Sequence, residues 1–153
     1  MPAELDFERE AANTKRCREM FKDNMRVAVP KVYDKYTYSR VLTMSFETGL
    51  PLTKVKEMHQ SGIDLRSLAQ LISQTFMHMI FKEGFIHADP HPGNIFVRKL
   101  PGGDSQLVLL DHGIYTELPT ETRLSYTKLW RGILAQDEAM IKQASSDLGC
   151  DFH

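Results

Sequence analysis

Apolar residues recur at helical spacing in the first half of the chain. Residues 4–22 carry a loose apolar stripe flanked by charge, which is typical of a surface helix. A more regular stripe runs from Leu65 to Ile80. Asp64 precedes it at the N-cap position, and Gly84 follows where a left-handed residue would end a helix. These positions predict two helices.

Two further helices are predicted near the end of the chain. Thr120 can cap a helix whose apolar positions are Leu124, Leu129, Trp130, Ile133 and Leu134. Asp137 can cap another helix that ends near Gly149. Both side chains can accept a hydrogen bond from a free backbone N–H of the first turn, which is why they favour helix starts.

Short apolar runs between the helices predict strands. Alternating valines in residues 27–32 indicate one strand, and Pro30 places it at an edge or makes it irregular because proline cannot donate a ladder hydrogen bond. The β-branched and apolar run Val41–Met44 predicts a second strand. Residues 49–51, Gly-Leu-Pro, are expected to end it.

A hairpin is predicted from two apolar runs that flank a turn. Ile95–Arg98 and Leu107–Leu110 are equal in length, and the turn signal Pro-Gly-Gly-Asp lies between them at residues 101–104. Strands of about 3.3 Å per residue then run out and back over the same distance. Asn94, before the first run, and Asp111, after the second, are therefore expected to be neighbours.

Composition and charge narrow the function classes. The chain has 153 residues, 42% hydrophobic and 25% charged, as in an ordinary globular domain. Its formal net charge of -1, with both signs interspersed, gives no general attraction to nucleic acid, so no nucleic-acid partner is expected. The longest apolar stretch, residues 76–81, is far shorter than the roughly 20 residues of a membrane span. No targeting segment is expected in the first ten residues.

Polar residues beside the hairpin suit a metal–nucleotide site. The amide of Asn94 and the carboxylate of Asp111 offer oxygen ligands, which Mg²⁺ prefers, usually together with phosphate and water. Asp89, five residues before Asn94, could orient a hydroxyl or a water, or accept its proton. With His87 and Gly113 these residues follow the pattern His-x-Asp-x4-Asn and Asp-x-Gly, the order of a kinase catalytic loop and magnesium loop.

The same segments resemble a known family. GFIHADPHPGNIFV followed by LVLLDHG closely resembles the signature of the UbiB, or aarF-domain-containing, atypical kinases. Residues 4–13, Glu-Leu-Asp-Phe-x-x-Glu-Ala-x-Asn, are similar to that family's Glu-x-Asp motif, and residues 41–49 to its last N-lobe strand and hinge. The resemblance extends from residue 4 to about residue 148. The DHG triplet and the LWRGIL segment are similar to the first-paralogue branch of the animal members.

The resemblance implies roles for the loop residues. Asp89 would be the catalytic-loop aspartate, and Asn94 and Asp111 would be the magnesium ligands. His91 occupies the position where protein kinases commonly carry a lysine near the transferred phosphate. His87 belongs to the same catalytic loop, and we expect it to hold the loop by hydrogen bonding rather than to move a proton.

The resemblance also implies nucleotide contacts. Glu4 would be the carboxylate that pairs with the nucleotide-binding lysine, and Asp6 belongs to the same motif. Without the resemblance, both residues would be solvated charges at a helix start. The backbone of Phe46, Glu47 and Thr48 would meet the adenine of ATP.

The chain departs from the family pattern in several places. The phosphate loop, the strand lysine and the Lys-x-Gly-Gln region of the family would precede Glu4, so we expect this glutamate to lack its partner and the chain to be an inactive fragment, from a partial gene model or a truncated isoform. Family members also continue past His153 with more C-lobe helices. Ser45 stands where the family usually has glutamate, and His112 where the magnesium loop usually has phenylalanine.

Two other function classes fit part of the pattern. His87, Asp89 and His91 alternate, and could offer a transition metal two imidazoles and a carboxylate, as in a metal-dependent hydrolase. Alternate residues share a face only in an extended strand, which Pro90 and Pro92 disfavour. A non-catalytic, pseudokinase-like binding or regulatory module would instead keep the fold without the reaction.

These observations predict an α+β chain with part of a protein-kinase-like fold, namely the end of the N-lobe, the hinge and the first half of the mainly helical C-lobe. We expect a single partial domain over residues 1–153, with an N-lobe remnant at 1–49 and a C-lobe portion at 50–153. The predicted function is that of an atypical kinase or ATPase that uses ATP and Mg²⁺. The resemblance further implies a mitochondrial setting, membrane association, and a lipid or quinone-related substrate linked to coenzyme Q.

Overall fold

The computed structural model describes residues 6–150 and divides into two compact units. The first unit comprises Met1–Phe76 and His87–Tyr115, and the second comprises Met77–Ile86 and Thr116–His153. The short strands β3 (Phe85–His87) and β6 (Tyr115–Glu117) pair with each other, and along both strands the chain passes from one unit to the other. The predicted division between residues 1–49 and 50–153 remains a prediction.

The first unit begins with the predicted helix. Helix α1 spans Phe7–Met20, and the Asp6 carboxylate accepts hydrogen bonds from the backbone N–H groups of Glu8 and Arg9 at 3.2 and 3.3 Å. Such a cap satisfies N–H groups that have no partner within the helix. The face that α1 buries is small and mixed in character, comprising Ala11, Thr14 and Cys17.

A four-stranded sheet forms the core of the first unit, with the order β1-β5-β4-β2. The predicted hairpin is confirmed as β4 (Ile95–Lys99) and β5 (Ser105–Leu109), which pair antiparallel with Ile95 opposite Leu109. Strand β1 (Val27–Ala28) pairs parallel with β5 at one edge, as expected from Pro30. The fully buried side chains of the hairpin are Val97, Leu107, Val108 and Leu109.

The second predicted strand is wrong. Within the run Val41–Met44, only isolated bridges form, Tyr38 with Val41 and Val32 with Met44. A strand occurs instead where a terminating turn was expected, at β2 (Leu50–Pro51), which pairs antiparallel with β4. Its proline is tolerated because β2 lies at the sheet edge. One turn of 3-10 helix, η2 (Asp34–Tyr36), lies before the run Val41–Met44.

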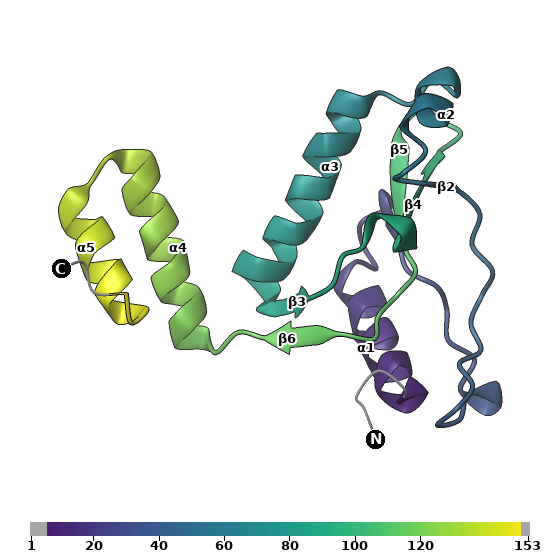
Figure 1. Ribbon diagram of the computed structural model, residues 1–153, viewed down its shortest axis with the longest axis horizontal. Helices are drawn as coiled ribbons and strands as arrows, with labels where there is room; N and C mark the ends of the chain where they lie inside the picture. Colours follow the sequence, from purple (N-terminus) through teal and green to yellow (C-terminus); the bar gives the residue numbers. More distant parts are fainter. Residues whose placement is uncertain (1–5, 151–153) are drawn as a thin grey trace. The chain divides into compact units, whose positions relative to one another are not determined.

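The long central helix is confirmed and runs beside the sheet (Figure 1). After the short helix α2 (Val55–Gln60), α3 spans Leu65–Met77, and the Asp64 carboxylate accepts from the Arg66 N–H at 2.9 Å. The helix continues as a π-helical turn, η3 (His78–Glu83), which nothing in the sequence pattern indicated. Gly84 ends it with a φ of 65°, as predicted for a left-handed stop.

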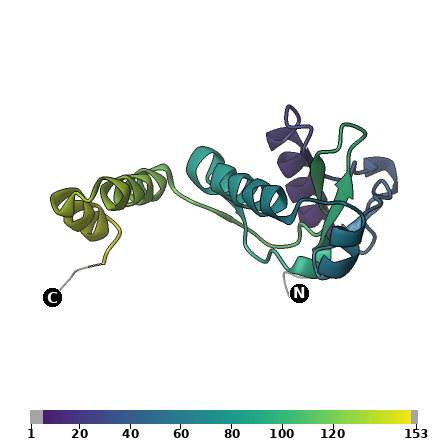
Figure 2. The same cartoon turned by 90° about the horizontal axis from the view of Figure 1, so that it is seen from above.

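The second unit is helical. Helices α4 (Thr120–Ala135) and α5 (Glu138–Asp147) pack against each other as a hairpin (Figure 2). Asp137 caps α5 by accepting from the Met140 N–H at 3.0 Å, as predicted. Thr120 is the first residue of α4 rather than its cap, because Pro119 takes the N-cap position without a side-chain bond. Proline at that position has a fixed φ and no N–H to satisfy.

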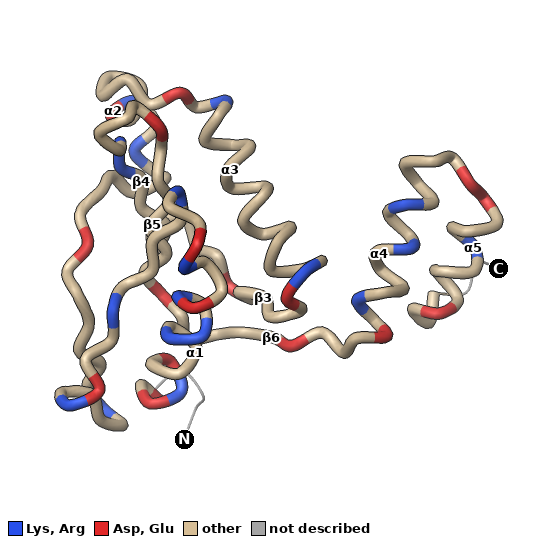
Figure 3. The backbone as a smooth tube through the Cα atoms, turned by 180° about the vertical axis from the view of Figure 1, so that it is seen from behind, with Lys and Arg blue, Asp and Glu red and all other residues tan. Residues whose placement is uncertain are grey.

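Lys and Arg are interspersed with Asp and Glu along the described backbone (Figure 3). Among the residues that the structure describes, no helix is both long enough and apolar enough to cross a membrane.

Candidate active site

The hairpin brings Asn94 and Asp111 together, as its geometry predicted. The Asn94 Nδ2 group donates a hydrogen bond to Asp111 Oδ2 at 2.8 Å. The backbone supports this contact, because Leu110 N–H donates to the Asn94 carbonyl at 3.0 Å and extends the β4–β5 ladder by one step. Both side chains are half-buried.

The loop before β4 places Asp89 at the surface of the unit. The Asp89 N–H donates to Nδ1 of His87 at 3.3 Å, and the Asp89 carbonyl accepts from the His91 N–H at 2.8 Å. The loop then closes into one turn of 3-10 helix, η4 (Pro92–Asn94). His87 is buried whereas Asp89 is exposed, so a buried ring anchors the loop that presents the carboxylate.

His87 also reaches the second loop. Its side chain is hydrogen-bonded to the backbone of Asp111. Because Nδ1 accepts from Asp89, the ring N–H that faces Asp111 is the one on Nε2. Burial lowers the pKa of His87, and its contact with the Asp111 backbone opposes that effect. The neutral ring therefore joins the Asp89 loop to the Asp111 loop, which agrees with the holding role expected from the sequence.

A pocket of about 380 Å³ opens at the point where these loops meet α1. It is lined by Phe7, Glu10, His87, Asp89, Asp111, Gly113 and Ile114. Three carboxylates thus share one concave site. Anionic phosphates would be repelled there unless cations neutralised the charge.

Glu10 and Asn13 hold the Asp111 loop from the side of α1, and neither was predicted as a site residue. Glu10 Oε1 accepts from the His112 N–H at 3.4 Å, and Asn13 Nδ2 donates to the His112 carbonyl at 2.9 Å. Burial raises the pKa of Glu10, the contact with the His112 N–H opposes this, and the negative charge of Asp111 adds to it. The sequence could have indicated that Glu10 and Asn13 act together, because residues three apart share one face of a helix.

A buried polar cluster lies beneath the same loop. The Asp111 Oδ1 atom accepts from the Gly113 N–H at 3.0 Å, while the His112 ring lies within hydrogen-bonding distance of the Leu109 carbonyl at 3.0 Å and the Tyr115 hydroxyl at 2.9 Å. Burial lowers the pKa of His112 to about 4. Tyr115 and Cys17 are hydrogen-bonded through their side chains, and burial raises the pKa of Cys17 to about 11.

This arrangement coincides with a family match over almost the whole chain: residues 1–145 match the ABC1 atypical kinase-like domain. The chain belongs to the ABC1 atypical kinase-like family. The resemblance to the aarF-domain-containing atypical kinases is thereby confirmed, and so is the kinase-like fold.

Relatives of this ABC1 chain are much longer proteins. The chain is 42% identical over 149 residues to AarF domain-containing kinase 1 of Drosophila melanogaster, with 97% of this chain and 29% of the relative covered. It is 39% identical over 150 residues to the probable serine/threonine-protein kinase abkB of Dictyostelium discoideum, with 98% of this chain and 22% of the relative covered. The chain thus spans less than a third of the length of these relatives.

A solved structure shares the fold. The structure of Rv3197 with erythromycin from Mycobacterium tuberculosis superposes with a TM-score of 0.68 over 94% of this chain and 35% of that chain. At 23% sequence identity, this similarity concerns the fold alone.

Other predicted site residues of the ABC1 chain do not line the pocket. Among the described residues, His91 is exposed and its Nδ1 accepts from the Gly93 N–H at 3.1 Å, while the Asp6 carboxylate caps α1. Glu4 lies outside the described residues. In residues 6–150, no group of three or more His, Cys, Asp or Glu is placed to hold a metal ion. The alternating His87, Asp89 and His91 therefore gain no geometric support as a transition-metal site.

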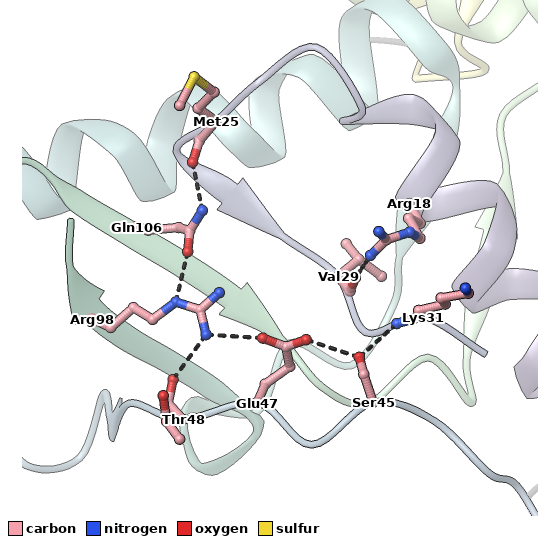
Figure 4. Close-up of polar contacts among 9 residues, drawn as sticks. All are labelled: Arg18, Met25, Val29, Lys31, Ser45, Glu47, Thr48, Arg98 and Gln106. Atoms are coloured by element: carbon pink, nitrogen blue, oxygen red, sulfur yellow. Dashed lines mark hydrogen bonds and ion pairs between the residues drawn. The ribbon is translucent and has the colours of Figure 1, made fainter. Parts of the chain in front are cut away.

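The expected hinge of the ABC1 chain is held by a separate polar network (Figure 4). The Glu47 carboxylate accepts from Arg98 at 2.9 Å and from the Ser45 hydroxyl at 2.9 Å, and the Thr48 carbonyl accepts from Arg98 at 3.4 Å. Phe46 points outward and is 92% exposed.

Glu47 and Arg98 also line a pocket of about 490 Å³ beside the end of α1 and β1. This pocket is larger than the one at Asp111. The smaller pocket is the one lined by Asp89 and Asp111, the residues that carry the kinase-like sequence pattern.

Proposed function

We propose that this chain forms the phosphate-facing part of an ATP- and Mg²⁺-dependent atypical kinase or ATPase. One observation carries the proposal: the 2.8 Å contact between Asn94 and Asp111 lies beside a pocket that Asp89 and Asp111 line together. The order and spacing of these residues match the two loops of a phosphoryl-transfer site. Because the chain covers 29% of its Drosophila relative, the activity of the whole protein is part of the proposal.

The side chains of Asn94 and Asp111 fit a magnesium ion. Asp111 provides carboxylate oxygens, and the Asn94 amide lies beside them with its Nδ2 2.8 Å from Asp111 Oδ2. Mg²⁺ commonly takes one or two protein ligands and completes its octahedron with phosphate and water. A half-turn of the Asn94 amide would present its oxygen in place of Nδ2. When bound, the ion would neutralise charge on the phosphate oxygens. Glu10 and Asn13 would keep the Asp111 backbone in place through His112.

Asp89 would act on the group that receives the phosphate. Its exposed carboxylate can orient a hydroxyl or a water, or accept its proton. The hydrogen bonds of His87 to Asp89 and to the Asp111 backbone hold the two loops at a constant separation. That rigidity is what positioning requires, since phosphoryl transfer depends mainly on placement and charge stabilisation.

Besides Glu4, which lies outside the described residues, Glu10 is a second carboxylate that could pair with a cation of the nucleotide site. It lines the pocket with Asp111, and burial raises its pKa, so a positively charged partner would relieve its desolvation. A lysine that binds nucleotide is the partner found in kinases. The adenine would meet the backbone of Phe46, Glu47 and Thr48, which the contacts with Arg98 hold.

The biological setting is proposed by family resemblance alone. From that resemblance we propose a mitochondrial setting with membrane association and a lipid or quinone-related substrate. Cell fractionation of the tagged protein would test the localisation. Recovery in a compartment other than mitochondria would contradict it.

Thermal-shift titration with ATP and Mg²⁺ tests the nucleotide site. A ligand that binds only the folded state stabilises it by about 2.7 kcal/mol at a hundredfold excess over Kd. We expect stabilisation that depends on Mg²⁺, is lost in Asp111→Ala, and persists in Asp104→Ala, which changes the same residue type in the hairpin turn. Equal shifts in both variants, or no shift in the folded protein, would contradict the proposal.

An ATP hydrolysis assay separates a catalytic chain from a binding module. Turnover that falls in Asp89→Asn, with magnesium–ATP binding unchanged, would assign the reaction to this chain. If the chain binds magnesium–ATP but shows no ATP turnover that depends on Asp89, the non-catalytic, pseudokinase-like module would be favoured. The assay would use the same preparation as the thermal-shift titration.

A further inference from the structure

A chain of buried polar side chains runs beneath the loop that carries Asp111. His112 and Cys17 are fully buried, and Tyr115 is 7% exposed. The three rings of His87, His112 and Tyr115 pack together, with centroids 5.1 to 6.1 Å apart. Phenylalanine, which the magnesium loop usually carries where this chain has His112, would fill this space but could make none of the polar contacts.

The partners of His112 determine which of its nitrogens carries the proton. The Leu109 carbonyl can only accept, so the N–H of the ring lies on Nε2 and donates to that carbonyl at 3.0 Å. Burial keeps the ring neutral, which leaves Nδ1 with a lone pair. The Tyr115 hydroxyl therefore donates to Nδ1 at 2.9 Å. The side chain of Tyr115 is also hydrogen-bonded to that of Cys17.

These bonds fix residue 112 on three sides. The ring is tied to the end of β5 through Leu109 and to Tyr115, at the start of β6. Its backbone N–H and carbonyl are tied to Glu10 and Asn13 of α1. Rotation of the loop away from the pocket would leave buried donors and acceptors unpaired, which is costly. The neighbouring Asp111 is thereby constrained.

We propose that His112 is a positioning residue whose directed hydrogen bonds to Leu109 and Tyr115 hold the Asp111 carboxylate against Asn94 and the Gly113 N–H. The catalytic or metal-binding role of Asp111 rests on the proposed function. The orientation of Asp111 does not, because it can be measured in the protein without a ligand.

Nuclear magnetic resonance of the wild-type chain and Tyr115→Phe tests the orientation. Long-range ¹⁵N–¹H spectra should show His112 as the tautomer protonated on Nε2. Tyr115→Phe keeps the ring and removes the donor to Nδ1, so hydrogen exchange at the Gly113 N–H should become at least tenfold faster, with a shifted Asn94 side-chain amide signal. Amides of β4 and β5 should keep their protection, which shows that the sheet remains folded.

Tyr36→Phe is the matched control, since Tyr36 is 56% exposed and lies in η2. It should leave the Gly113 and Asn94 signals unchanged. His112→Phe should reproduce the effect of Tyr115→Phe at Gly113, and if it fails to fold, Tyr115→Phe alone decides. A His112 ring protonated on Nδ1, or unchanged Gly113 exchange in Tyr115→Phe, would overturn the proposal.

Nucleotide binding then separates this inference from the proposed function. If the wild type shows magnesium-dependent ATP binding, Tyr115→Phe should weaken it about tenfold while Tyr36→Phe does not. Equal affinity in Tyr115→Phe would show that the orientation does not serve the metal–nucleotide site, and the inference would fail while the proposed function stands. Absence of binding in the wild type would contradict the proposed function, and the exchange measurement would still decide the orientation.

Discussion

The open end of the β4–β5 hairpin, opposite its turn, and the segment before β2 lie in the same unit but are held in different ways. At the hairpin end, Asn94, Asp111 and His112 are fixed by contacts from α1, β5 and the Asp89 loop. The segment from Tyr38 to Thr48 forms only isolated bridges. Its first part is held by local hydrogen bonds, such as those of Thr43 with Thr37 and Tyr36, and its last part by the contacts of Glu47 and Thr48 with Arg98. A site for precise chemistry requires the first kind of support, whereas a backbone edge that meets a flat ligand can rely on the second.

The largest difference should appear when one apolar side chain of each region is truncated to alanine. Leu107→Ala removes a fully buried side chain of β5 and should lower the free energy of unfolding by roughly 3 kcal/mol. Val41→Ala, at a position 53% exposed, should change it by less than about 0.5 kcal/mol. Urea denaturation measures both. Equal losses would contradict the distinction between the regions.

The hairpin end should also be sensitive to acid. The unfolded His112 ring titrates near its ordinary pKa of 6.5, while burial lowers the folded value to about 4. The unfolded chain therefore binds a proton that the folded ring excludes, so the free energy of unfolding falls as the pH decreases from about 6.5 to about 4. At about 1.4 kcal/mol per tenfold change in proton affinity, the loss is on the order of 3 kcal/mol.

Comparison with His112→Phe isolates this contribution. Burial lowers the pKa of His87, which acts in the same direction, and raises the pKa of Glu10, which acts in the opposite direction. Both groups remain in the variant. Denaturant melts across this pH range should therefore show a shallower slope for His112→Phe than for the wild type. Parallel slopes would mean that His112 does not titrate as its burial requires.

A smaller effect is expected at the hinge network. Arg98→Met removes the bonds to Glu47 and the Thr48 carbonyl, and should destabilise the chain by about 1 kcal/mol because the pair is only partly buried. Lys54→Met breaks an exposed ion pair with Glu57 and should leave the denaturation midpoint unchanged. Proteolysis after Arg40 should be faster in Arg98→Met than in the wild type, because the neighbouring segment loses its anchor. An unaltered cleavage rate would contradict the anchoring role.

The same contrast explains what the sequence could predict. The hairpin, α1, α3 and the Asp137 cap follow from local spacing, and equal strand lengths were enough to bring Asn94 beside Asp111. The run Val41–Met44 has strand propensity, but a strand also needs a neighbouring strand to pair with. In this fold β4 pairs with β2, and the run forms only isolated bridges.

Long-range contacts account for what was missed. The parallel pairing of β1 with β5 joins residues about eighty positions apart and leaves no local pattern. The π-helical turn η3 has no recognised signal in the sequence. Glu10 lay within the resemblance motif, but its place in the pocket became visible only once α1 was packed against the Asp111 loop.

The central claim is that Asn94 and Asp111 hold a divalent cation together with a nucleotide. Mn²⁺ accepts similar oxygen ligands and broadens the magnetic resonance signals of nearby nuclei. With ATP and substoichiometric Mn²⁺, we predict the strongest broadening at Asn94 and Asp111, loss of that broadening in Asp111→Ala, and none at Asp104 in the hairpin turn. Broadening spread over exposed carboxylates, or persisting in Asp111→Ala, would contradict the account.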